Sequence, residues 1–424
     1  MTASLAGKRL LVLGAYASEV EIVRQAQAMG VYVIVTDNHE DWRDAPAKYA
    51  ADEAWDVSWS DTGALLERCA ERPVDGVIAG FSERRVACAQ RLASALGLPF
   101  YADGAKLDVI LRKDAFRSAC ESAGVAVPRS YSVGDAEPPV IVKPVDNGGS
   151  RGITVCRDRG EVEAACLRAA SFSDAGAVVI EDYIVADEAM VYYVVHDGVA
   201  TLSAMCDRYM HSFDPGITQL PVGYLFPSRH LALFEGEHDE RFRRLISDLG
   251  IANGLIAFQC FVKNGEVIPF DPTYRLDGTM AYRATEAVNG TSALEMLIRM
   301  SLTGSMGEAA AIEARETPHF PKTCFELPVL LGRGRVGTVE GEEAVRSVDG
   351  VYFVDWKVAV GDVMKERAGF SQMACRVQLT ADGEESLRAR LSEVYAAVRV
   401  LDEYGDDMVI YREPRALACG EVSR

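Results

Sequence analysis

Lys143 ends a short apolar run, Val140 to Val142, that has the composition of a buried strand. A buried ammonium group is costly without an anion beside it, so this position predicts a negative charge nearby. A glycine-rich segment follows, made of Gly148, Gly149, Ser150, Arg151 and Gly152. Glycines let a ligand approach the backbone closely, so the lysine and the segment together are typical of a phosphate-binding hairpin. A flexible hairpin tip with a surface lysine is the alternative.

Two acidic residues, Glu181 and Glu188, flank the pair Tyr183-Ile184. A strand end followed by a short connection suits an adenine-binding hinge, in which backbone groups from Asp182 to Ile184 read the edge of the base. Glu188 would then accept hydrogen bonds from ribose hydroxyls. The alternative is two acids on a solvated loop, which is the commoner arrangement.

A third group lies on a predicted hairpin that turns at Asn264-Gly265. Gln259 and Asp271 stand on its two strands, and Thr273 and Arg275 follow at alternate positions, so all four face the same way. Oxygen ligands on a rigid sheet beside a triphosphate are what Mg²⁺ prefers, and an arginine there suits a phosphoryl or carboxylate oxygen. An amphipathic strand with polar outer positions is the alternative.

The elements that position these groups begin with a strand–helix–strand unit, which seeds a parallel sheet. We expect strands at 9–13, 31–36 and 76–79, helices at 18–29, 63–70 and 84–96, and a short strand near 99–101. The first loop carries only one glycine of the GxGxxG pattern, which disfavours dinucleotide binding. Ligands lie at the carboxyl ends of such strands, so Gly14, Asp37 and Glu83 are candidates for contact with a small substrate.

Composition narrows the class of protein. The chain has 424 residues, enough for about three domains, and a formal net charge of −19, which argues against a nucleic-acid or membrane partner. Its ten cysteines form no CxxC pair and indicate reduced thiols of a cytoplasmic protein. No apolar run approaches the ~18 residues of a membrane span.

The order of these motifs resembles the ATP-grasp superfamily over about 300 residues, and within it the carboxylate–amine ligases similar to biotin carboxylase and L-amino-acid ligase. The residues that match the family pattern are, in chain order, Lys113, Lys143 with its glycine segment, Glu181, Glu188 and Arg275. Lys113 matches because it lies ten residues before Ala123-Gly124. The chain departs from the family pattern at the metal positions. Gln259, Asp271 and Thr273 carry one formal charge where two are common, which puts a second Mg²⁺ in doubt.

The resemblance implies a combined α/β and α+β architecture. We expect an open parallel α/β domain over 1–105, the two α+β subdomains of the grasp over 106–185 and 186–315, and a small α+β domain over 316–424 that closes the acceptor side.

It also implies a reaction, in which ATP phosphorylates a carboxylate and an amine attacks the acyl phosphate. Lys113, Lys143 and the glycine segment would bind phosphates, Gln259, Asp271 and Thr273 would bind Mg²⁺, and Lys143 and Arg275 would be catalytic. Arg208 and Gly278 are the candidates on the substrate side, and a homodimer is possible. Two alternatives stay open: a carboxyphosphate-using enzyme, and a nucleotide-binding member without ligase activity.

Overall fold

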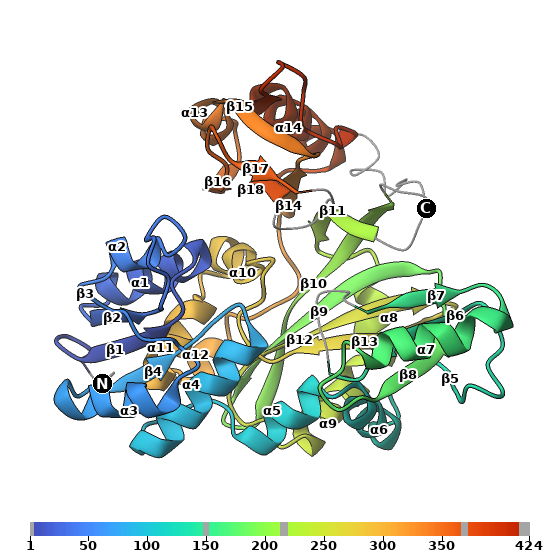
Figure 1. Ribbon diagram of the computed structural model, residues 1–424, viewed down its shortest axis with the longest axis horizontal. Helices are drawn as coiled ribbons and strands as arrows, with labels where there is room; N and C mark the ends of the chain where they lie inside the picture. The colour runs from blue at the N-terminus through green and yellow to red at the C-terminus, as the bar shows by residue number, and fades with distance from the viewer. Residues whose placement is uncertain (1–3, 147–151, 213–218, 366–371, 415–424) are drawn as a thin grey trace.

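The computed structural model describes residues 4–146, 152–212, 219–365 and 372–414. Within these ranges the strands form a parallel sheet near the N-terminus, a small antiparallel sheet, a large antiparallel sheet and a three-stranded sheet near the C-terminus. In Figure 1 the N-terminal sheet lies at the left, the small antiparallel sheet at the right, and the C-terminal strands at the top. None of the described helices is long and apolar enough to cross a membrane.

The N-terminal sheet is parallel, with the strand order β3-β2-β1-β4. Its strands are β1 (Arg9–Leu13), β2 (Tyr32–Thr36), β3 (Glu53–Trp55) and β4 (Gly76–Ile78). The helices between and after them are α1 (Ala17–Ala28), α2 (Ala47–Ala50), α3 (Thr62–Glu71) and α4 (Glu83–Leu96). The strands are almost continuously buried, as a parallel sheet covered on both faces requires.

A helix from much later in the chain, α11 (Ala293–Thr303), packs against β4 and α1. The approach is so close that a Cβ atom at Gly76 would lie 2.4 Å from the Ser301 carbonyl oxygen, so only glycine fits there. The short strand expected near 99–101 is wrong. Tyr101 instead packs edge-on against Tyr274, with ring centroids 5.1 Å apart, and thereby contacts the end of a strand of the large sheet.

The small antiparallel sheet has the order β5-β8-β6-β7 and follows two helices, α5 (Gly104–Leu111) and α6 (Lys113–Ala123). Its elements are β5 (Ser130–Tyr131), β6 (Val140–Pro144), β7 (Thr154–Cys156), a 3₁₀ turn (Arg159–Glu161), α7 (Val162–Ala170) and β8 (Val178–Asp182). Val140 and Val142 pack under α7. Because side chains alternate along a strand, Lys143 points to the opposite face of this sheet.

The large sheet has eight strands in the order β13-β12-β9-β10-β11-β14-β18-β16. They are β9 (Asp187–His196), β10 (Val199–Ser212), β11 (Gln219–Phe226), β12 (Gly254–Lys263), β13 (Glu266–Thr273), β14 (Thr323–Leu330), β16 (Val351–Trp356) and β18 (Met373–Ala381). The helices along this stretch are α8 (Leu231–Glu237), α9 (Asp239–Asp248), α10 (Tyr282–Asn289) and α12 (Ala309–Glu313).

The two faces of this sheet pack against different helices. Tyr193 and Phe258 pack on one face with Phe242 of α9. Met190 and Tyr192, which alternate with Tyr193 along β9, lie on the other face, where alanines of the α10 segment cover part of it. We call this second face the ligand face, because Gln259 and Asp271 lie in register with Met190 and therefore on the same side.

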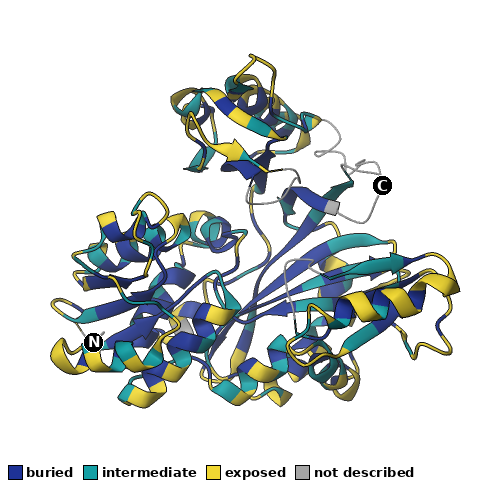
Figure 2. Ribbon diagram, viewed as in Figure 1, coloured by how far each residue is buried: buried dark blue, intermediate teal, exposed yellow. Residues whose placement is uncertain are grey.

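The C-terminal residues contribute β14, β16 and β18 to the large sheet and also form a separate sheet beyond it. That sheet consists of β15 (Gly334–Glu340), β17 (Val363–Met364) and β19 (Arg399–Asp402), with α13 (Glu342–Arg346) and α14 (Glu384–Ala397). The long strands of the large sheet are mostly buried, whereas α7 exposes its outer side (Figure 2). The predicted fold class, a parallel α/β unit joined to antiparallel α+β units, is confirmed. The domain boundaries stay a prediction.

Candidate active site

Lys143 and Glu181 form a buried ion pair on the inner face of the small sheet. The Lys143 Nζ atom lies 2.6 Å from a carboxylate oxygen of Glu181, and both side chains are about nine-tenths buried. Arg117 of α6 approaches the other oxygen of Glu181 at 3.8 Å. The anion beside the buried lysine is therefore supplied by the protein itself when no ligand is present.

A small cavity of about 20 Å³ joins this pair to the large sheet. Its lining includes Lys113, Lys143 and Glu181 on one side and Pro269 and Phe270 of β13 on the other. Lys143 of the small sheet and Pro269 and Phe270 of β13 thus face one crevice, although they are more than 120 residues apart in the sequence.

The charges of Asp271 and Lys113 influence each other. Desolvation raises the pKa of the Asp271 carboxyl, and the neighbouring Lys113 ammonium opposes that shift. Burial lowers the pKa of Lys113, and Asp271 is the main charge that opposes the change. Among the other neighbouring charges, Glu83 raises the pKa of Asp271, whereas Lys143 and Arg275 lower it.

The three predicted metal ligands share the ligand face. Gln259 and Asp271 are opposite each other in register, with the Gln259 amide nitrogen donating to Asp271 at 3.4 Å. Thr273 follows two residues later, and its buried hydroxyl oxygen has no hydrogen-bond partner among the described residues. No group of three or more His, Cys, Asp or Glu side chains able to hold a metal occurs in the described part of the chain. An oxygen set of one carboxylate, one amide and one orphaned hydroxyl fits a Mg²⁺ ion whose other ligands come from phosphates and water.

Arg275 lies just beyond β13 and pairs with Glu83 at the start of α4. Its Nε donates to Glu83 at 2.7 Å, and a terminal nitrogen donates to the Leu276 carbonyl oxygen at 2.8 Å. Glu83 follows the carboxyl end of β4, so this end of the N-terminal sheet contacts the residue that lies just beyond β13. Asp37 instead accepts hydrogen bonds from His39, and Gly14 lies against the Arg85 side chain.

The other nucleotide candidates also have partners within the protein. The Asp182 carboxylate accepts a hydrogen bond from the Tyr131 hydroxyl at 2.6 Å, and the Tyr183 amide donates to the Pro139 carbonyl at 3.1 Å. Ile184 follows, half-buried. Gly152 has a φ of +75°, and a Cβ atom there would collide with Phe172. Gly148, Gly149, Ser150 and Arg151 lie outside the described residues.

Glu188 and Arg208, predicted for ribose and substrate, pair with each other. They are opposite in register on β9 and β10, and their closest charged atoms are 2.6 Å apart. Burial raises the pKa of Glu188, and Arg208 opposes that shift. Gly278, the other substrate candidate, is exposed, with open space where a side chain would start. The Arg208 side chain is therefore buried in an ion pair on the large sheet, whereas Gly278 is exposed to solvent.

This ion pair begins a polar row that crosses the ligand face. Consecutive strands place five side chains in register: Glu188, Arg208, Tyr224, Glu326 and Gln378. The Gln378 amide donates to the backbone carbonyls of Thr279 and Met280 at 3.3 and 3.2 Å, and Met280 has a φ of +57°. The C-terminal strands therefore hold the segment that follows Arg275 in place.

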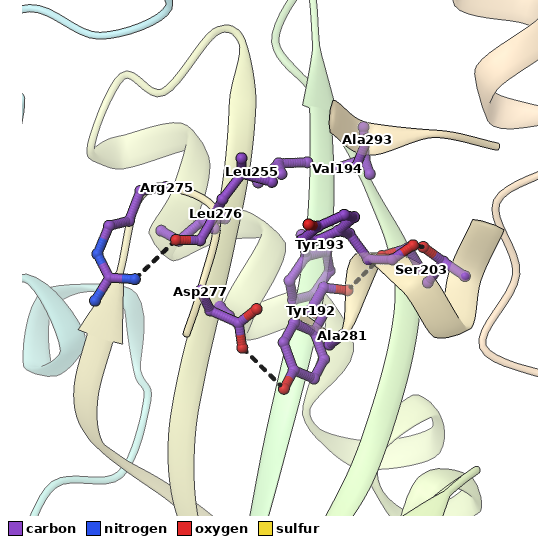
Figure 3. Close-up of a pocket in the computed structure, with 14 residues that line it drawn as sticks. Tyr192, Tyr193, Val194, Ser203, Leu255, Arg275, Leu276, Asp277, Ala281 and Ala293 are labelled. Carbon is purple, nitrogen blue, oxygen red and sulfur yellow. Dashed lines mark hydrogen bonds between the residues drawn. The ribbon is translucent and has the colours of Figure 1, made fainter. Parts of the chain in front are cut away.

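A second cavity, of about 40 Å³, lies behind Arg275 between the ligand face and α10 (Figure 3). Tyr192 and Asp277 form part of its wall and are joined by a hydrogen bond from the tyrosine hydroxyl at 3.4 Å. Sequence reasoning missed both residues. The position of Asp277, two residues beyond Arg275, is the one sequence signal that could have identified it. Tyr192 lies within an apolar strand, and its neighbours in the sequence give no such signal.

Comparison with known proteins agrees with this architecture. The profile of the ATP-grasp N-terminal domain matches residues 23–100. A D-alanine–D-alanine ligase of Fusobacterium nucleatum subsp. nucleatum is 34% identical over 105 residues, which are 24% of this chain and 34% of the ligase. The chain thus spans about a third of the length of that relative.

Solved structures match over nearly the whole chain. An L-amino acid ligase from Bacillus licheniformis superposes with a TM-score of 0.78 at 18% identity, covering 94% of this chain and 99% of the ligase. A biotin carboxylase from Campylobacter jejuni, solved as a beta-gamma-ATP complex, gives a TM-score of 0.73 at 15% identity, covering 93% and 92%. These matches confirm the resemblance found in the sequence: the chain has the ATP-grasp fold.

Proposed function

We propose that this protein is an ATP-dependent carboxylate–amine ligase that forms an acyl phosphate and releases ADP and phosphate. The observation that carries the proposal is one crevice lined by Lys113 of α6, by Lys143 of the small sheet and by β13, the strand of the large sheet that carries Asp271. Arg275 follows the same strand, β13, and lines the second cavity. Nucleotide and acid substrate would therefore meet between the two cavities.

Binding of ATP would replace the present ionic partner of Lys143 with a phosphate group. Phosphate oxygens would replace Glu181 beside Lys143, and Lys113 would hold a second phosphate. The segment Asp182–Ile184 and Glu188 would contact the adenosine, and the glycine segment 148–152 would cover the phosphates, as the resemblance implies.

Gln259, Asp271 and Thr273 are the residues that would hold Mg²⁺. When bound, the ion would neutralise part of the negative charge of the phosphates. Because Asp271 is the one charged residue of the three, the triphosphate would provide most of the ligands of the ion.

The proposed reaction has two steps. An oxygen of the carboxylate attacks the γ-phosphorus, a new O–P bond forms, and the bond to the bridging oxygen of ADP breaks. The amine nitrogen then attacks the acyl carbon, the C–O bond to phosphate breaks, and the nitrogen releases a proton to solvent. Arg275 would stabilise the negative charge on the transferring group and the acyl oxygen.

The substrates of such a reaction are two small molecules, one with a carboxylate and one with an amine. Assembly as a homodimer remains a proposal.

A coupled assay for ADP, with ATP, Mg²⁺ and panels of carboxylates and amines, tests the function. We expect ADP release that needs both substrates and is lost in Lys143→Ala. Lys263→Ala, on the exposed end of β12, is the matched control and should keep full activity. Production of AMP would contradict the acyl-phosphate route, and ADP release with bicarbonate and no amine would favour the carboxyphosphate alternative.

A further inference from the structure

The peptide group that precedes Arg275 is held by a tyrosine from the N-terminal part of the chain. The Tyr101 hydroxyl donates to the Tyr274 carbonyl oxygen at 3.2 Å, and the Tyr274 hydroxyl donates back to the Tyr101 carbonyl oxygen at 3.0 Å. Both rings are buried, and a Cβ atom at Gly254 would lie 2.7 Å from one ring and 2.9 Å from the other. Packing this tight keeps the two rings, and with them the Tyr274 carbonyl, in one position.

The residue that follows Arg275 is held from the same direction. The Phe81 amide lies between β4 and α4 and donates to the Leu276 carbonyl oxygen at 3.1 Å. That oxygen also accepts the hydrogen bond from the Arg275 guanidinium. The backbone on both sides of Arg275 therefore has partners in the segments that flank α4.

The backbone is strained where these segments meet. Four non-glycine residues in the described ranges have a positive φ. Two of them, Asp197 and Asn264, lie in hairpin turns, where this conformation is ordinary. The other two are Phe81, with a φ of +59°, and Met280, with a φ of +57°. Such strain persists only where surrounding contacts impose it, and it is concentrated at functional sites.

The Arg275 side chain has a partner of its own in the same region. Its guanidinium pairs with Glu83, and the arginine side chain is only 12% exposed. Burial raises the pKa of the Tyr101 hydroxyl, the Arg275 charge lowers it and the Glu83 charge raises it. The hydroxyl that holds the backbone is therefore within electrostatic range of the ion pair that holds the side chain.

We propose that Tyr101 and Glu83 are positioning residues, which hold the Arg275 guanidinium in its active orientation before any substrate binds. A cation fixed in advance stabilises developing negative charge without first having to move. The inference rests on the proposed function only for the statement that Arg275 acts on the transferring group.

Modification of arginine side chains in the full chain, without any ligand, tests this orientation. Phenylglyoxal reacts with accessible guanidinium groups, and peptide mass spectrometry gives the rate at Arg275 relative to Arg43. The Arg43 side chain is 86% exposed and serves as the internal reference. Because Arg275 is buried and paired, we expect it to react at least about tenfold more slowly than Arg43 in the unaltered protein.

Three variants separate the contacts from general destabilisation. Glu83→Gln replaces a charge-assisted hydrogen bond by a neutral one and should raise the rate at Arg275 about tenfold. Glu83→Asp keeps the charge and should restore most of the protection. Tyr101→Phe removes one hydrogen bond to the backbone and should raise the rate about three- to fivefold.

Tyr274→Phe is the matched control for Tyr101→Phe. It removes the reciprocal hydroxyl from the same pair of rings but leaves the Tyr274 carbonyl oxygen bound to Tyr101. The rate at Arg275 should then change by less than about twofold. A merely structural role of the ring pair would make the two phenylalanine variants equal.

Equal rates in Tyr101→Phe and Tyr274→Phe would overturn the inference, as would an unchanged rate in Glu83→Gln or an Arg275 as reactive as Arg43 in the unaltered protein. Glu83 is 36% exposed, so its variants remain informative if Tyr101→Phe does not fold. The expected rates without any ADP release would support the inference and count against the ligase proposal. ADP release together with contrary rates would do the reverse.

Discussion

The two sides of the candidate site differ in how their buried charges are compensated. On the phosphate side, which comprises Lys113, Lys143, Glu181 and Asp271, each charge faces an opposite charge of the protein itself. On the substrate side, which comprises Arg275, Asp277 and the 40 Å³ cavity, Arg275 has Glu83, but Asp277 has only hydroxyl donors among the described residues. If the proposed function holds, binding on the first side would exchange one ionic partner for another, whereas a group bound beside Asp277 on the second side would meet only hydroxyl donors.

Asp271 is the residue on which the phosphate side depends most. Asp271→Asn keeps the shape of the side chain and removes the one formal charge of the proposed metal set. We expect kcat to fall by about 10²–10³-fold, the size of effect that follows loss of a group stabilising transferred charge. Steady-state ADP release measures it, with Glu266→Gln as the control on the same hairpin. Activity within a factor of two of the unaltered protein would remove Asp271 from the proposed site.

Glu181→Gln tests the exchange of partners directly. Without the carboxylate, Lys143 loses its internal anion, so inorganic triphosphate should bind about tenfold more tightly than to the unaltered protein. Triphosphate is the useful probe because it carries no adenine and is insensitive to a hinge role of Glu181. The affinity is read by calorimetry in the absence of metal. An unchanged or weaker affinity would mean that Glu181 does not compete with phosphates.

The sequence motifs include Lys113, Lys143 and Glu181, which line the crevice. They do not include Tyr192 and Asp277, which line the 40 Å³ cavity. Lys143, Glu181 and Asp271 lie in short motifs whose local pattern already requires a strand, a turn or a buried charge. The partner of Arg275 is Glu83, more than 190 residues earlier, and only the packing of the N-terminal sheet on the large sheet brings them together. Local patterns carry no information about such contacts.

The polar row shows the same limit within one sheet. Arg208 is a predicted substrate-side residue, and the strand register, which the local sequence does not reveal, places Glu188 directly opposite it, so that the two side chains form an ion pair. The order of the eight strands, which brings Glu326 and Gln378 into the row, depends on non-local pairing that local sequence patterns do not show.

A separate prediction, of stability and not of activity, concerns Glu326, which lies in the polar row on β14. Burial raises its pKa from an ordinary value of 4.5 to about 8, against the opposing effect of Arg376. The folded state therefore keeps a proton that the unfolded state releases, so this group lowers the free energy of unfolding as pH rises from 4.5 to about 8 and adds no further change above that.

Glu326→Gln should flatten this part of the pH profile, by at most about 1.4 kcal/mol per pH unit. Urea unfolding at intervals between pH 5 and pH 9 measures the difference, with exposed Glu343→Gln as the control. Parallel profiles for Glu326→Gln and the unaltered protein would show that Glu326 is ionised throughout and paired with Arg376.

The central claim, that a substrate carboxylate is phosphorylated by ATP in this crevice, is tested most directly with isotopically labelled acids. Carboxylic acids with ¹⁸O in the carboxylate are incubated with ATP, Mg²⁺ and an amine panel, and the released phosphate is examined by mass spectrometry. Transfer of one ¹⁸O atom into phosphate for each ADP formed is the predicted result. ADP release with unlabelled phosphate, or label appearing in AMP, would contradict the acyl-phosphate route.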